Sequence, residues 1–309
     1  NFQSVGSAIT AMTCGIAGAV TFNMTAGAPV YNEQITIPAI PGASGVNNVT
    51  FNGNGNTLSY NATSAANPHT LTLNGTDYFT FNNLNIVGTG NEYALVCHLW
   101  NQADSNRFNN CSFSAPAEGD ATTQCAFSIS GDPASHTAQG NAGNYNVVSN
   151  CRIKSGYYAA YVAGSSTNRA IKNQFKNCDF LDFYTYAIRM DHTDSIVIAQ
   201  CNVERPTRIN MAGFYGLYMG SGTRNALIDR NRVHDSYAKD TTHQSLTFAI
   251  YGNAHAVAGG ENVITNNIVY NIKSDGIIQG IHINNYNHYR VYNNTVYIDH
   301  PGSNSSAIT

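Results

Sequence analysis

The sequence predicts an all-β fold, a right-handed parallel β-helix of about 9–10 coils with a short helix over its N-terminal end. Two short apolar motifs alternate along most of the 309 residues. Each motif has the period-2 alternation of a strand, and the unit that holds one copy of each spans 23 to 40 residues. Units of this length cannot bury an apolar face alone, so neighbouring units must stack on one another.

The first motif reads apolar, any residue, an Asn-like residue, then Leu, Cys or Asn, any residue, and apolar. Its eight copies begin at Phe81, Phe108, Val148, Phe175, Ile198, Ile228, Ile264 and Val291. The second motif begins with Ala or Gly and continues with an apolar residue. Its eight copies begin at Ala94, Ala126, Ala159, Ala187, Gly216, Ala249, Gly280 and Ala307. Segments of about five residues are too short for helices, so both motifs predict strands.

The fourth position of the first motif predicts a stacked column at a tight corner. Successive coils lie about 4.8 Å apart, which brings equivalent side chains into line. An Asn in such a column can bond its amide to the next coil and satisfy buried backbone groups. Stacked Cys side chains have parallel Cβ vectors, which favours free thiols over disulfides. The column is expected to contain Cys111, Cys151, Cys178 and Cys201, followed by Asn231, Asn267 and Asn294.

The segment before the repeats predicts a cap. Gly15 is the expected stop of a short helix whose apolar residues recur at helical spacing: Phe2, Val5, Ile9 and Met12. We interpret the chain as a single domain over 1–309, divided into a cap at 1–16, irregular first coils at 17–80 and regular coils at 81–309. The first residue is not Met and the strand at Ala307 has no closing element, so we expect a fragment of a longer protein.

Composition excludes several partners. Charged residues make up 11% of the chain, against roughly 25% in ordinary globular proteins. A net charge of -3 without a basic run makes nucleic acid an unsuitable partner. No apolar stretch approaches the roughly 18 to 20 residues that cross a bilayer, so membrane insertion is not expected. The spacing of the seven cysteines fits no zinc motif, and neither a metal nor a cofactor is expected.

Three segments carry a resemblance to known families. They are Phe2-Gln-Ser-Val-Gly-Ser-Ala-Ile, Tyr31-Asn-Glu-Gln-Ile-Thr-Ile and Val49-Thr-Phe-Asn-Gly53. They resemble the start of pectin methylesterase-like β-helices of the pectate lyase-like superfamily. The chain is still more similar to β-helix regions of very large surface proteins of the Bacteroidetes type, exported by the type IX pathway. This resemblance implies a secreted or cell-surface location, the outer-membrane secretion machinery as a partner, and a monomeric module.

The resemblance also places a site. In that superfamily the corner lies between the second and third sheets, so the strands headed by Ala or Gly form the first sheet, which carries the active site in its enzymes. The outward positions expected on that sheet are Val96, Ser128, Tyr161, Arg189, Tyr218, Tyr251 and His282, with Asp191, Asn253 and Asn284 next along their strands. The predicted glycan-binding residues are Tyr161, Arg189, Asp191, Tyr218, Tyr251, His282 and Asn284. The connections expected to flank them are 130–145, 204–214, 235–247 and 253–261.

Catalytic chemistry has little support in these residues. A glycoside hydrolase needs converging acidic groups, and the Asp-Asp pair of the polygalacturonase-like enzymes is absent. A calcium-dependent lyase needs a carboxylate cluster and a base, and only Asp191, Asp194 and Arg189 approach one. A pairing of His282 with a tyrosine as base and acid, as in alginate lyase-like enzymes, remains open. No residue is assigned a catalytic role.

Three functions follow from this reading. The first is a non-catalytic module of a large exported protein, adhesive or structural, that binds an extracellular polysaccharide. The second is a polysaccharide-degrading enzyme, a uronate lyase or a related pectinase-like activity. The third is an inert structural spacer. The weakly charged, repetitive surface and the missing acid clusters favour the first.

Overall fold

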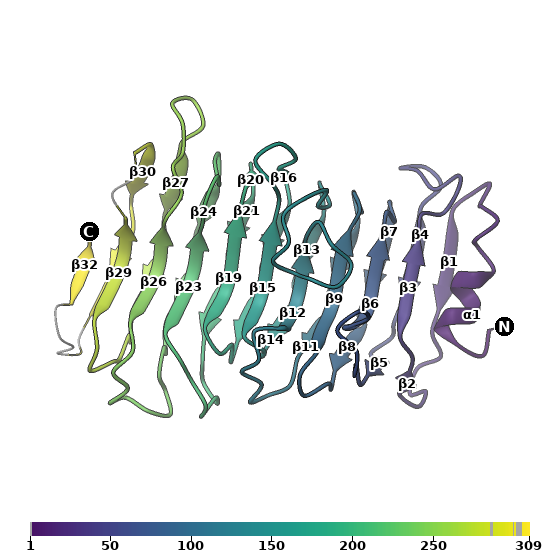
Figure 1. Ribbon diagram of the computed structural model, residues 1–309, viewed down its shortest axis with the longest axis horizontal. Coiled ribbons are helices and arrows are strands. Elements are labelled where there is room, and N and C mark those ends of the chain that lie inside the picture. Colours follow the sequence, from purple (N-terminus) through teal and green to yellow (C-terminus); the bar gives the residue numbers. More distant parts are fainter. Residues whose placement is uncertain (1, 285–286, 299, 301–304) are drawn as a thin grey trace.

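The chain is a right-handed parallel β-helix of about ten coils, as predicted. The computed structural model describes residues 2–284, 287–298, 300 and 305–309. Three sheets of ten parallel strands each run the length of the molecule, and consecutive strands of the chain pass from one sheet to the next. Figure 1 shows the strands stacked side by side along the long axis, with α1 at the N-terminal end.

The first motif of each repeat forms sheets A and B, and the second motif forms sheet C. Sheet A contains β1 (Val20–Asn23), β4 (Val49–Asn52), β7 (Phe79–Asn82), β10 (Arg107–Asn109), β13 (Val147–Ser149), β17 (Gln174–Lys176), β21 (Val197–Ala199), β24 (Leu227–Asp229), β27 (Asn262–Thr265) and β30 (Tyr289–Tyr292). Sheet B contains β2 (Tyr31–Asn32), β5 (Thr57–Tyr60), β8 (Asn85–Gly88), β11 (Ser112–Ser114), β14 (Arg152–Lys154), β18 (Asp179–Leu181), β22 (Asn202–Glu204), β25 (Arg232–Val233), β28 (Ile268–Val269) and β31 (Thr295–Val296). Sheet C contains β3 (Ile35–Pro38), β6 (His69–Asn74), β9 (Ala94–Trp100), β12 (Gln124–Ile129), β15 (Tyr158–Ala163), β19 (Tyr186–Asp191), β23 (Phe214–Met219), β26 (Thr247–Gly252), β29 (Ile278–Ile283) and β32 (Ser306–Ile308). A small fourth sheet pairs β16 (Ala170–Ile171) with β20 (Thr193–Asp194).

The core is a continuous stack of apolar side chains inside the coils. Phe51, Phe81 and Phe108 share one register position on β4, β7 and β10. Their rings stack with centroids 5.6 Å and 5.0 Å apart. Burial of such rings is the main stabilising contribution, because the effect scales with apolar area removed from water.

The predicted column of stacked Cys and Asn side chains lies at the corner between sheets A and B. The residue before the column adopts the left-handed conformation in each coil, for example Asn110 with φ 53° and Asn266 with φ 57°. Asn tolerates this conformation better than most residues. In the column itself, Asn267 Oδ1 accepts from the backbone N–H and the side-chain amide of Asn231, both at 2.9 Å. All seven cysteines are free thiols, including the four of the column, for which free thiols were predicted.

A second asparagine ladder, which was not predicted from the sequence, lies at the corner that enters sheet A. Asn106 donates through its backbone N–H to Asn146 Oδ1 at 2.9 Å, and Asn146 donates in the same way to Asn173 Oδ1 at 3.0 Å. All three side chains are buried. The signal was present in the sequence, because each of these Asn residues stands two positions before the first residue of a first-motif copy.

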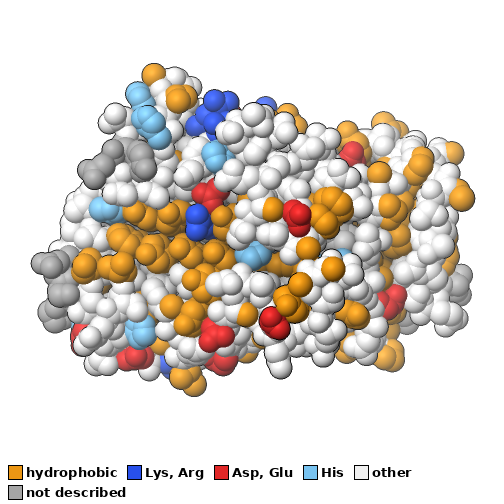
Figure 2. Space-filling view, in the orientation of Figure 1, with side chains coloured by type: hydrophobic (Ala, Val, Ile, Leu, Met, Phe, Trp, Pro, Cys, Tyr) orange, Lys and Arg blue, Asp and Glu red, His pale blue; other side chains and the backbone are white. Residues whose placement is uncertain are grey.

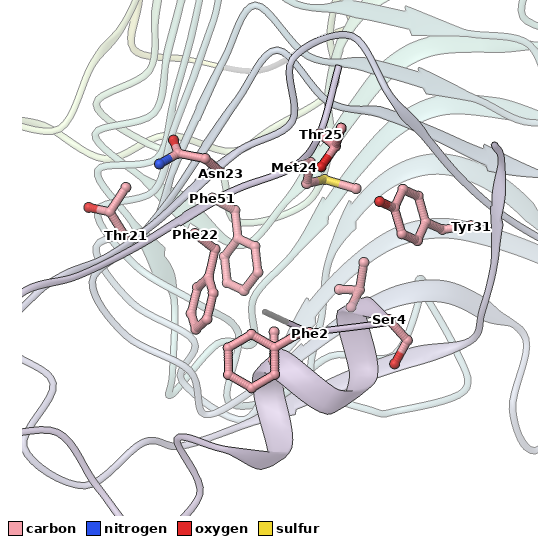
Figure 3. A pocket seen from close by; sticks show the side chains of 11 residues that line it. Phe2, Ser4, Thr21, Phe22, Asn23, Met24, Thr25, Tyr31 and Phe51 are labelled. Atoms are coloured by element: carbon pink, nitrogen blue, oxygen red, sulfur yellow. The ribbon is translucent and has the colours of Figure 1, made fainter. Parts of the chain in front are cut away.

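The helix α1 (Val5–Thr10) lies at the N-terminal end of the coils, as expected. It ends at Thr10 rather than running to Gly15, because the N–H of Met12 turns back to the carbonyl of Ile9 at 2.9 Å. A pocket of about 440 Å³ lies between α1 and the first coil (Figure 3). Phe2 and Phe22 meet edge to face beside it, with centroids 5.6 Å apart. With six residues, α1 is too short to cross a membrane, and no other helix in the described part of the chain could do so.

Candidate functional site

The outer face of sheet C brings the predicted row together. Strand pairing aligns Tyr161 with Arg189, Arg189 with Tyr218, Tyr218 with Tyr251, and Tyr251 with His282. These five residues therefore occupy one position on five consecutive coils, about 4.8 Å apart. In Figure 2, hydrophobic side chains gather over β19, β23 and β26 on this face, with a basic and an acidic group among them.

One expected member of the row was wrong. Val96 is buried in the core, and His98 stands in register with Ser128 instead. The Ala that heads β9 pairs with Gln124, whereas the sequence analysis had aligned it with Ala126. The two strands begin in register, but Ala94 lies two register positions before Ala126, and that offset of the motif moves the outward position from Val96 to His98.

A second aromatic row lies beside the first and was not predicted. It consists of Tyr158, Tyr186, Tyr215 and Phe248, which are register partners on β15, β19, β23 and β26. Neighbouring ring centroids are 4.9 to 5.3 Å apart. Each of these residues stands directly before the Ala or Gly that heads a copy of the second motif. We name the two rows together the sheet C strip: Tyr158, Tyr161, Tyr186, Arg189, Tyr215, Tyr218, Phe248, Tyr251 and His282.

Arg189 is the charged centre of the sheet C strip. Its Nε donates to Asp191 Oδ2 at 2.9 Å, and Asp191 also accepts from the Tyr161 hydroxyl. The guanidinium carbon lies 5.4 Å from the ring centroid of Tyr161 and 5.1 Å from that of Tyr218. A third ring, that of Tyr186, lies at 5.6 Å. Cation–π contacts of this kind hold the guanidinium plane in place.

Electrostatics keep this centre in one charge state. Burial would lower the pKa of Arg189, but the charge of Asp191 and the neighbouring tyrosine hydroxyls outweigh it, so the net shift is upward. Burial, together with the carboxylate of Asp191, raises the pKa of Tyr161 well above its usual range. Burial also raises the pKa of Tyr186 to about 12. Arg189 therefore stays a cation beside Asp191, and Tyr161 and Tyr186 stay neutral, at physiological pH.

The strip is covered at one end and open at the other. His136, from the connection 130–145, packs on Tyr158 and Tyr161 with ring centroids 5.0 Å and 5.6 Å away. Figure 1 shows this connection crossing in front of the strands. Both tyrosines are buried, whereas Tyr186 and Tyr251 stay half-buried. The accessible part of the strip therefore begins at β19 and runs toward β29.

Amide side chains extend the site beyond the rings. Asn253 donates to the Tyr218 hydroxyl at 2.9 Å, and Asn284 donates to Asn253 Oδ1 at 2.9 Å. His282 Nδ1 lies 2.6 Å from the hydroxyl oxygen of Thr309. Polar groups that converge beside aromatic rings can fix the orientation of a bound ligand. Asn284 thus joins the site through the chain of amides, as a neighbour of the strip rather than a member of its rows.

The connection 204–214, which leads into β23, is held firmly. Arg205 is fully buried, with its guanidinium carbon 4.4 Å from the ring centroid of Tyr237 and its Nε donating to the carbonyl of Ser236 at 2.8 Å. Arg208 donates to the carbonyls of Gly119 at 2.8 Å and Ala117 at 3.1 Å. These bonds tie the connection to a segment several coils away, so it forms a fixed border at the entry to β23.

The comparisons with known proteins support the fold. The family model described as "Right handed beta helix region" matches residues 167–306. The alginate lyase from Paenibacillus sp. str. FPU-7 is similar in structure, with a TM-score of 0.60 and 14% identity over 98% of this chain and 95% of that one. PfbA, a surface adhesin of Streptococcus pneumoniae, has a TM-score of 0.57 and 10% identity over 99% and 87% of the two chains. The sequence gives no match among curated proteins.

These comparisons define the class of protein. The chain is a right-handed parallel β-helix protein, and this fold occurs both in an alginate lyase and in a surface adhesin. At such low identity the likeness concerns the fold alone. Fold does not decide function, so activity must be inferred from the residues of the sheet C strip.

Proposed function

We propose that this chain is a non-catalytic binding module of an exported or cell-surface protein, and that the sheet C strip binds an extracellular acidic polysaccharide. The observation that carries this proposal is the position of Arg189. Its side chain is 29% exposed, held at Nε by Asp191 and enclosed by tyrosine rings. Export by the type IX pathway, with the outer-membrane secretion machinery as partner, is the wider setting that we propose for the module.

Arg189 has the geometry to recognise an anionic group. Asp191 engages its Nε, and Nη1 and Nη2 have no hydrogen-bond partner among the described residues. A guanidinium fork binds carboxylate or sulfate through two parallel hydrogen bonds. Because the tyrosines and Asp191 already fix the side chain, little conformational entropy is lost when a ligand binds.

The aromatic rows fit an extended sugar chain. Tyr186, Tyr215, Phe248 and Tyr251 are half-buried, so each offers part of a ring to solvent. Amphipathic rings supply apolar contact area and a hydroxyl at once, and the rows repeat at about 4.8 Å per coil along the long axis. A linear polysaccharide lying along that axis would contact several coils, with one uronate at Arg189.

A lyase is the second candidate, and the contact between Tyr218 and Arg189 favours it. Tyr218 lies against the Arg189 guanidinium, which could neutralise a uronate carboxylate while a base removes the adjacent proton. His282 has its pKa lowered by burial, so it is neutral at pH 7. It stands three coils from Arg189, about 14 Å away, and the two cannot act on one sugar. Binding without cleavage is therefore the better-supported activity.

The test is binding of immobilised polygalacturonate, alginate and a neutral galactan. We expect wild-type protein to bind the acidic polymers and Arg189→Gln to lose at least about tenfold in affinity, because a charge-assisted bidentate contact disappears. Tyr218→Ala/Tyr251→Ala should lose binding to the same polymers. A matched control, Tyr292→Ala/Tyr297→Ala, removes two exposed tyrosines that lie at the end of β30 and directly after β31, away from sheet C, and should bind normally.

Circular dichroism of each variant separates a lost site from a lost fold. No binding by the folded wild-type protein would contradict the proposal and support the inert spacer. Undiminished binding in Tyr218→Ala/Tyr251→Ala would place the site elsewhere. Release of unsaturated uronate from alginate or polygalacturonate, followed by ultraviolet absorbance, would establish the lyase instead.

A further inference from the structure

A cluster on the outer face of sheet B has the composition of a metal site. Glu204 ends β22, and His234 follows β25 one coil later, where the backbone pairs Val203 with Val233. Asp235 comes next in the chain. One oxygen of each carboxylate and Nδ1 of His234 all lie within 4.8 Å of one another. This site lies on a different sheet from the sheet C strip, and no metal site was predicted from the sequence.

The hydrogen bonds around the cluster fix the imidazole. Asn202 donates its amide to Glu204 Oε1 at 2.7 Å, because a carboxylate only accepts. The amide oxygen of Asn202 therefore faces His234 Nε2 at 2.7 Å, and Nε2 must carry a proton. The ring also stacks on Tyr270, with centroids 4.6 Å apart. His234 Nδ1 is thereby directed at the two carboxylates.

Because His234 Nδ1 faces two carboxylates, a positive charge is needed between them. Nδ1 lies 2.5 Å from Asp235 Oδ2 and 3.8 Å from Glu204 Oε2. A neutral imidazole protonated on Nε2 would point its lone pair at two anionic oxygens, which is repulsive. Either a second proton on the ring or a metal ion must stand between them. The remaining oxygens, Glu204 Oε1 and Asp235 Oδ1, are each held by an amide, from Asn202 and Asn271 respectively.

We propose that His234, Glu204 and Asp235 bind a divalent transition-metal ion of the Zn²⁺ class. One imidazole nitrogen and two carboxylate oxygens suit such an ion, whereas Ca²⁺ prefers oxygen ligands alone. Asn202 and Asn271 are the outer partners that orient the ligands, as is usual around bound metals. To admit an ion, His234 Nδ1 and Asp235 Oδ2, which are 2.5 Å apart, must move apart. The side chains of Glu204 and Asp235 are 20% and 29% exposed, so an ion can enter from solvent.

Equilibrium dialysis of the whole chain against Zn²⁺, with metal content measured by mass spectrometry, tests the site. We expect one Zn²⁺ per wild-type chain, none displaced by Ca²⁺, and loss of the ion in His234→Gln and in the near-isosteric Glu204→Gln. Asn202→Leu should weaken binding about 10–100-fold, the usual effect of losing an outer partner. His243→Gln is the matched control, because within the described residues His243 forms an ion pair with one carboxylate, that of Asp240.

Cobalt substitution gives a second measurement. Co²⁺ bound by one nitrogen and two oxygens absorbs visible light, and the absorbance should vanish in Glu204→Gln while the far-ultraviolet circular dichroism stays unchanged. Absence of stoichiometric Zn²⁺ in the wild-type chain would overturn the proposal and leave a second proton on the ring as the cation. Unchanged Zn²⁺ content in both His234→Gln and Glu204→Gln would overturn it equally.

Discussion

Replacing Asn267 by Leu is expected to lower the free energy of unfolding by about 3 kcal/mol. Asn267 Oδ1 is the acceptor for the backbone N–H and the amide of Asn231, and its own amide donates to the carbonyl of Ile228 at 2.9 Å. Leu fills a similar volume but removes the acceptor of the Asn231 backbone N–H and of one Asn231 amide hydrogen, while the other amide hydrogen still donates to the carbonyl of Ile198. An unsatisfied buried group costs about 1–3 kcal/mol, and more than one is created here.

Equilibrium urea unfolding measures this effect. Asn61→Leu is the control, since Asn61 is exposed and surface substitutions usually change stability by less than about 0.5 kcal/mol. If Asn267→Leu unfolds at the same urea concentration as the wild-type protein, the ladder contributes no net stability and the corner must be held by other contacts.

Acid is expected to destabilise the protein between about pH 6.5 and pH 4 because of three buried histidines. Burial lowers the pKa of His69 and of His98 to about 4, and that of His136 to about 3. In the unfolded chain these groups titrate near their ordinary value, about 6.5. The unfolded state therefore takes up protons first as the pH falls. Stability is fully present above about pH 6.5 and declines toward pH 4.

His98 shows why the neutral ring is preferred. Its Nε2 lies 2.8 Å from the carbonyl oxygen of Asp132, which can only accept, so that nitrogen carries the proton. Its Nδ1 then accepts from the Ser128 hydroxyl at 2.6 Å. A second proton on the fully buried ring would lose this bond and the solvation of its charge. The shift corresponds to about 3 kcal/mol for His98 alone, against a total stability of about 5–15 kcal/mol.

Thermal melts from pH 7.5 to pH 4 test this expectation. The wild-type melting temperature should fall steeply below about pH 6, and His98→Asn should show a shallower fall because one titrating group is gone. His255→Asn, at an exposed position, should follow the wild-type curve. Equal slopes for wild type and His98→Asn would show that His98 takes no part in the acid transition.

The sequence predicts the parts of this molecule that repeat in register. The column of Cys111, Cys151 and Asn267 and the row through Arg189 and Tyr218 each occupy a fixed place in a motif. Stacking converts such a fixed place into spatial alignment, so both follow from spacing alone. The misplacement of Val96 arose because Ala94 lies two register positions before Ala126, so an outward position counted from the Ala of the motif falls on the wrong residue in β9.

The features that could not be predicted depend on contacts between segments that share no motif. His136 reaches the strip from a connection of its own, and its position over Tyr158 follows from the path of that connection through space. Arg208 bonds to a carbonyl 89 residues away, which spacing cannot show. The pairing of Glu204 with His234 was accessible in principle, because both directly follow the last residue of a first-motif copy. Their chemistry becomes visible only when Asn202 is seen to orient the ring.

The parallel sheets give the molecule a mechanical character. The hydrogen bonds that join neighbouring coils run along the long axis, so a pulling force on the two chain ends opens them one coil at a time rather than shearing whole sheets. Each opened coil releases a length set by its residues: Phe81 and Phe108 are 27 residues apart, and Phe108 and Val148 are 40 apart. At about 3.4 Å per residue these coils lengthen the chain by about 90 to 140 Å. Single-molecule stretching should therefore show successive extensions of that size. The module would then unfold stepwise under force, one coil at a time.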